Sequence, residues 1–269
     1  MNLKGRLAPL ALYELVKEER KGAGHRRPIA IGGADELVAE LAKAFRAGGD
    51  AGAVVEQGAA ARAAALVWLG PPDEGVLRTA SRAGVPIVGV SEGGGLPYVL
   101  DTDLVSLVPG RPLPVGEIVR RLARVLGTDG VGLAARLPVL REAVIDELIR
   151  SSSRRNGLIG AAVFVPGVDL PVLLLNQLRL VLRIALAHGH ELDASRLPEV
   201  LAVVGAGFGF RSVARELLDL VPVAGWVLKG GVAYGGTKAI GEAARKRFAS
   251  WPPPSDRGPT LSANSEGGH

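Results

Sequence analysis

The chain has 269 residues, of which 48% are apolar but only 4% aromatic, so its cores must consist mainly of Ala, Val and Leu. This length can hold two domains. The absence of cysteine excludes disulfides, thiolate nucleophiles and cysteine-based metal sites. The net charge of +5 fits an anionic partner, either nucleic acid or a membrane surface, but a general preference for Arg explains it equally well. Because the arginines are not interleaved with aromatic residues, we expect no nucleic-acid stacking surface.

The first 27 residues predict an N-terminal helix and a basic linker. Apolar residues recur at helical spacing over residues 7–21, and residues 21–27 are basic and contain glycine. No long apolar stretch with a cleavage pattern is present at this end, so we expect no signal peptide.

Residues 28–127 alternate short apolar runs with amphipathic stretches. The expected strands are 28–33, 53–56, 65–70, 85–91 and 103–110, and the expected helices are 35–46, 73–83 and 115–126. Apolar strands that alternate with helices are typical of a parallel sheet covered on both faces. The pattern predicts an α/β domain with a small, mainly parallel sheet and flanking helices, similar to flavodoxin or a G domain.

Only helical patterns follow, which predicts an all-α helical domain over residues 130–249. The expected helices are 133–150, 158–165, 169–187, 197–206, 210–220 and 223–247, with a polar, basic joint at 151–156. Asp169 is well placed as an N-cap, with Pro171 in the first turn, and Gly189 is suited to close the same helix. The Pro-, Ser- and Gly-rich residues 250–269 are expected to be disordered.

The helix at 169–187 is strongly apolar except for one narrow polar stripe. Asn176, Arg179 and Arg183 lie at positions i, i+3 and i+7 and so share one side of the helix. Each Arg at the centre of a membrane would cost about 2.5–3.5 kcal/mol, so we do not expect this helix to insert alone. Its other faces must be covered by neighbouring helices or by lipid. Asp169 can also pair with one of the two arginines or line a cavity.

Small residues recur at a spacing that suits close helix packing. Gly205 and Gly209 are four residues apart, as are Gly231 and Gly235, and Gly241 follows between one and two turns later. Basic residues at 154–155 and 245–247 flank the apolar region. If the region enters a membrane, these clusters predict that both of its ends lie on the cytoplasmic side.

The loop after the first expected strand contains Gly32 and Gly33, which are weak candidates for binding a nucleotide phosphate. The phosphate-loop motif is absent, because the next lysine is Lys43, two turns into the following helix. Asp35 and Glu36 place negative charge at the start of that helix, where a phosphate would be repelled. We therefore predict no NTP hydrolysis and no cofactor.

Two other stretches suggest chemistry but support it poorly. Residues 203–218 resemble the start of a dinucleotide-binding unit, but the third glycine is replaced by Phe210, so close helix packing explains the glycines better. His188 and His190 precede Glu191 and Asp193 without a second cluster of ligands elsewhere, so we predict a solvated loop and no metal site.

Several short motifs together resemble the YcjF-like, GTPase-associated helical domain family, whose function is unknown. They are VPGVDLP (165–171), LNQLRLVL (175–182), IALAHG (184–189), GAGFGFR (205–211) and AYGGTKAIG (233–241). The resemblance covers about residues 137–248 and marks as motif residues Pro166, Asp169, Pro171, Gln177, Arg179, Arg183, Gly189, Gly205, Gly209, Gly231 and Gly235. It implies a helical domain associated with membranes and joined to a degenerate, G-domain-like module, and it supplies no catalytic residues.

Our leading hypothesis is a non-enzymatic scaffold at the cytoplasmic face of the membrane or in the cytoplasm. Its partner would be an anionic membrane surface or a membrane protein. An alternative is a regulatory protein that binds a nucleotide or small ligand at the carboxyl ends of the strands, near Gly32 and Gly33 and residues 93–95. A third is a protein that self-associates through its helical domain.

Overall fold

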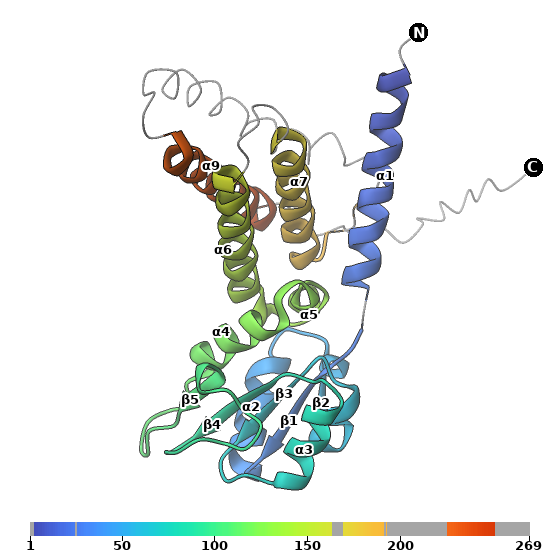
Figure 1. Ribbon diagram of the computed structural model, residues 1–269. Helices are drawn as coiled ribbons and strands as arrows, with labels where there is room; N and C mark the ends of the chain where they lie inside the picture. The colour runs from blue at the N-terminus through green and yellow to red at the C-terminus, as the bar shows by residue number, and fades with distance from the viewer. Residues whose placement is uncertain (1–2, 25, 163–168, 191, 193–224, 251–269) are drawn as a thin grey trace, which may run out of the picture.

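The computed structural model describes residues 3–24, 26–162, 169–190, 192 and 225–250 (Figure 1). Its five strands are β1 (Ile29–Gly33), β2 (Val54–Glu56), β3 (Ala65–Leu69), β4 (Ile87–Ser91) and β5 (Leu104–Ser106). All neighbouring strands are parallel, in the order β2-β1-β3-β4-β5. This is the strand order of flavodoxin-like domains. The predicted parallel α/β domain followed by a helical region is confirmed.

Alternate residues of the strands enter two different apolar layers. On β3, Val67 and Leu69 belong to one core cluster, whereas Leu66 and Trp68 belong to the other. The first layer lies under α2 (Asp35–Arg46) and α4 (Val115–Leu126). The second lies under α3 (Glu74–Arg82) and a short 3-10 helix at Gln57–Arg62. Further 3-10 helices are Ala51–Ala53, Asp101–Asp103 and Gly127–Asp129.

The helical half stands at one end of the sheet domain (Figure 1). It contains α1 (Leu3–Ala23), α5 (Gly130–Arg136), α6 (Pro138–Ala162), α7 (Asp169–Ala187) and α9 (Gly225–Ala249). The helix α6 contacts α4, α5, α7 and α9, so it links the sheet domain to the rest of the bundle. The core cluster under α2 and α4 continues into these helices, and the two halves therefore share one apolar core.

The polar joint predicted at residues 151–156 is wrong, because α6 runs unbroken through it. Ser153 and Asn156 are both fully buried and lie on the side of α6 that faces other helices. They occupy positions where the helical period calls for apolar residues, so their polarity looked like that of a linker. The polarity instead serves interactions inside the bundle.

Close packing between α6 and α9 depends on glycines, though not on the pair that the spacing suggested. A Cβ at Gly230 would lie 3.0 Å from the carbonyl oxygen of Gly157, and one at Gly241 would lie 2.7 Å from Cγ1 of Ile149. At Gly231 and Gly235, no described atom lies within 4 Å of the Cβ position. The close approach is therefore displaced by one residue, which turns the contact by about 100° around the helix.

Substitution of two glycines in α9 should have opposite effects on stability. Gly241→Ala places a methyl group against the buried Ile149 and should lower the free energy of unfolding by about 1–3 kcal/mol. Gly235→Ala adds a methyl group in open space and should raise it by up to about 1 kcal/mol through helix propensity. Urea unfolding of both variants measures the difference. Equal effects of the two substitutions would contradict close packing at Gly241.

Candidate functional site

The glycine turn at the end of β1 is closed by the protein itself. The amide of Gly33 donates to Oε1 of Gln57 at 3.3 Å, and the amide of Ala34 donates to the carbonyl of Leu69 at 2.8 Å. A Cβ at Gly33, whose φ is +117°, would lie 1.9 Å from the same carbonyl oxygen. A Cβ at Gly32 would meet the side chain of Gln57 at 2.6 Å. Contact with β3 and Gln57 therefore accounts for both glycines.

The second glycine-rich loop at the carboxyl ends of the strands is open. It follows β4, and the hydroxyl of Ser91 donates to the carbonyl of Gly94 at 3.2 Å. No described atom lies within 4 Å of the Cβ positions of Gly93, Gly94 and Gly95. The hydrogen bond of Ser91 therefore shapes the loop, and its glycines are not required by close contacts with other described residues.

The two arginines of the predicted polar stripe on α7 face α1. Arg183 donates to both carboxylate oxygens of Glu19, from Nε at 2.7 Å and from one terminal nitrogen at 2.9 Å, and Arg179 donates to Glu18 at 3.0 Å. The side chain of Glu19 is only 8% exposed, so this is a largely desolvated pair. The first helix of the chain therefore covers part of α7, and these charges hold helices together rather than facing lipid.

Asn176, the third residue of the stripe, turns toward α6 instead. Its amide donates to Oδ1 of Asn156 at 2.9 Å, and Asn156 donates to the hydroxyl of Thr237 on α9 at 2.9 Å. Gln177 also donates to Thr237, at 3.1 Å, and Thr237 donates to the carbonyl of Ala233 at 2.8 Å. The hydroxyl of Thr237 thus uses one donor and two acceptor positions, which is its full capacity. This polar cluster joins α6, α7 and α9 inside the core.

The remaining motif residues are placed as follows. Gly189 has φ +83° and follows α7, where its amide donates to Leu186 and that of His190 donates to Ala185, as in a Schellman turn. Pro171 lies in the first turn of α7 as the structure describes it. Asp169 is the first described residue of α7. Its predicted roles, as an N-cap and as a partner of one of the two arginines, therefore stay predictions. Pro166, Gly205 and Gly209 lie outside the described residues, as do the helices predicted at 197–206 and 210–220 and the tail.

The two histidines after α7 lie partly inside the bundle. His190 is buried, and its Nε2 lies 3.0 Å from the carbonyl oxygen of Phe248. The pKa of His188 is lowered to about 4, mainly because the imidazole is buried and to a smaller extent by the charges of Arg141, His190 and Arg245. Within the described ranges, no group of three His, Asp or Glu side chains is arranged to hold a metal ion.

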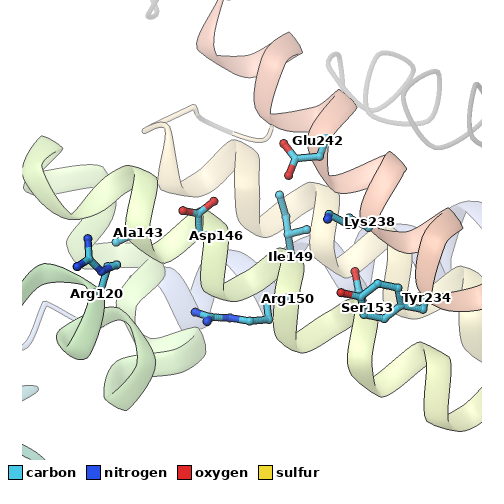
Figure 2. A pocket seen from close by; sticks show the side chains of 9 residues that line it. All are labelled: Arg120, Ala143, Asp146, Ile149, Arg150, Ser153, Tyr234, Lys238 and Glu242. Carbon is cyan, nitrogen blue, oxygen red and sulfur yellow. The ribbon is translucent and has the colours of Figure 1, made fainter. Parts of the chain in front are cut away.

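A pocket of about 370 Å³ opens between α4, α6 and α9, and its lining is shown in Figure 2. Arg120 comes from α4, Arg150 and Ser153 come from α6, and Tyr234 and Lys238 come from α9. Figure 2 shows Arg120 at one end and Ser153 with Tyr234 at the other. A volume of this size is in the range of sites for small ligands.

Sequence reasoning did not predict this pocket, nor the buried roles of Ser153, Asn156 and Thr237. The available signal was periodicity, because Ser153 and Asn156 fall in step with the buried Ile149 along α6. The pocket itself has no comparable signal, since its lining residues come from helices up to about 100 residues apart in the chain.

Among the described helices, none combines the length and apolar character needed to cross a bilayer. Comparison with known proteins gives no match to a family model, a curated protein or a solved structure. The resemblance to the YcjF-like family therefore stays a prediction.

Thr237→Val should reveal how strongly the polar cluster supports the bundle. The change keeps the shape of the side chain but leaves the buried amides of Asn156 and Gln177 without their acceptor, so the free energy of unfolding should fall by about 2–4 kcal/mol. Thr79→Val is the matched control, because Thr79 also donates to the carbonyl four residues earlier but is exposed. Chemical denaturation should show a change within about 0.5 kcal/mol for this control.

His188 should make the protein less stable in mild acid. Its pKa of about 4 in the folded protein lies below the ordinary value of 6.5, so below pH 6.5 the unfolded chain binds this proton more readily. Stability is therefore lost as the pH falls from about 6.5 to 4. His188→Asn should flatten this part of the stability profile, measured by urea unfolding at several pH values. An unchanged slope would mean that His188 titrates normally.

Proposed function

We propose that this chain is a non-enzymatic protein whose helical domain binds an anionic membrane surface peripherally. The observation that supports this most is a row of exposed residues along α6, which consists of arginines and one leucine. Arg150, Arg154 and Leu158 are spaced by four residues, so they follow one side of the helix, and Arg155 lies beside them. All four are exposed, and Leu158 is 73% exposed.

This combination suits the boundary between water and lipid headgroups. Each Lys or Arg near an anionic surface contributes about 1 kcal/mol of attraction, and a neighbouring apolar side chain can enter the headgroup layer. Lys238 and Tyr234 on α9 add a further positive charge and an exposed aromatic ring next to this side of α6. The α7 arginines do not take part, because α1 neutralises them.

The sheet domain fits a scaffold role better than it fits NTP hydrolysis. The amides of Gly33 and Ala34 already have acceptors within the protein, and Gln57 occupies the space above Gly32. A phosphate would have to displace these contacts. The family resemblance, which implies a membrane-associated helical domain beside a degenerate G-domain-like module, points the same way.

Co-sedimentation with lipid vesicles tests the proposal. The protein should bind vesicles that contain phosphatidylglycerol and should not bind pure phosphatidylcholine, and added salt should weaken the binding. Arg154→Glu with Arg155→Glu should weaken binding on the order of 30-fold or more, because two attractive charges are lost. Arg82→Glu with Arg111→Glu is the matched control, since both arginines are exposed on the sheet domain.

The proposal fails if the unmodified protein ignores anionic vesicles at low salt. It also fails if the control pair reduces binding as much as the α6 pair does, because net charge alone would then explain the attraction.

A further inference from the structure

The pocket between α4, α6 and α9 is lined by three cations and two carboxylates, and the carboxylates have a cation of their own. Its two carboxylates, Asp146 and Glu242, are both engaged by Arg245, which forms an ion pair with Asp146 and lies 3.7 Å from Glu242. For Arg120 and Lys238, no acidic partner lies within 4.0 Å among the described residues. Two cations of the lining are therefore available for an anion.

The third cation of the pocket is only partly neutralised. Arg150 binds Glu147 at 2.5 Å through one terminal nitrogen. A guanidinium group has five N–H donors, so its remaining donors can bind a second anion. Figure 2 shows Arg150 extended along the pocket between Arg120 and the Ser153 end.

A buried hydroxyl group without a partner lies in the same lining. Ser153 is fully buried, and its Oγ has no hydrogen-bond partner among the described residues. A buried polar group without a partner normally costs about 1–3 kcal/mol, so such groups often mark a place where a ligand or water binds. Tyr234, which is 39% exposed, lies at the same end of the pocket and provides a second hydroxyl group (Figure 2).

These observations favour one class of anion. A phosphate monoester has three terminal oxygens, which suits the ammonium group of Lys238 and the hydroxyl groups of Ser153 and Tyr234 at one end of the pocket (Figure 2), whereas a carboxylate has two oxygens. The buried Ile149 and the ring of Tyr234 offer apolar contact for the organic part of such a ligand. A pocket of about 370 Å³ can hold a small phosphorylated molecule or a phospholipid headgroup.

We propose that this pocket binds a phosphate monoester beside Lys238, with Ser153 and Tyr234 as hydroxyl donors, while Arg120 and Arg150 add positive charge along the rest of the pocket. The ligand is either a soluble phosphorylated compound or the headgroup of a lipid such as phosphatidic acid. The first case is independent of the proposed membrane function, and the second rests on it.

Titration calorimetry with glycerol 3-phosphate tests the soluble form on the full chain. Binding should saturate at millimolar concentration or below, and Arg120→Gln with Lys238→Gln should weaken it at least about tenfold. Lys246→Gln with Arg82→Gln is the matched control, because both residues are exposed and lie outside the pocket lining. Glutarate, a dicarboxylate, should bind more weakly than glycerol 3-phosphate.

Vesicles test the lipid form. At matched surface charge, the protein should bind phosphatidic acid, a monoester, more tightly than phosphatidylglycerol, a diester, and only the pocket variant should lose this preference. Arg154→Glu with Arg155→Glu should weaken vesicle binding but leave glycerol 3-phosphate binding unchanged, since neither residue lines the pocket. Failure of the membrane function and failure of the pocket are thereby distinguishable.

Ser153→Ala gives a readout that depends on the unpaired hydroxyl. Without ligand, the variant should unfold at the same temperature as the unmodified protein or higher, because the hydroxyl has no described partner to lose. It should bind glycerol 3-phosphate several-fold more weakly. The proposal is overturned if glycerol 3-phosphate does not bind and phosphatidic acid is not preferred, if glutarate binds as tightly, or if the control variant weakens binding as much as the pocket variant.

Discussion

The helical half of this protein depends on a buried cluster of hydrogen bonds, whose polar groups cannot be left without partners. The hydroxyl of Thr237 accepts from both Asn156 and Gln177, so α6, α7 and α9 must meet at one level along their axes. Apolar side chains alone would tolerate sliding, because apolar contacts are not directional. The same alignment brings Arg150 and Ser153 opposite Tyr234 and Lys238. The shape of the pocket therefore follows from the register that the cluster imposes.

Elements with strong periodicity were predictable from sequence. The helices at 35–46 and 115–126 agree with the predicted bounds to the residue, since their apolar spacing is clear and Gly127 ends the second. The buried strand at 65–70 was equally clear. These signals are local, because a helix or strand that covers a core shows its period within about a dozen residues. They were sufficient for the parallel sheet and the helical half.

The candidate sites were less predictable, because they depend on partners distant in sequence. The polar stripe on α7 is visible in the sequence. Its partners are Glu18 and Glu19 on one helix and Asn156 on another, and these depend on how the helices pack. Buried polar residues of α6 were mistaken for a linker for the same reason. The close contact is made by Gly230 and not by Gly231. Spacing alone cannot distinguish the two glycines, because a spacing of four residues can occur on any side of α9.

The pairing of α1 with α7 also affects how the chain matures. Glu19 and Arg183 are 164 residues apart, and the whole sheet domain lies between them. At synthesis rates of about 5–20 residues per second, α1 leaves the ribosome roughly 8–30 s before its partner helix exists. During that interval Glu19 lacks the arginines of α7 that later pair with it. The helix α1 thus precedes the sheet domain in the chain but completes its contacts with the bundle only after that domain and α7 have been made.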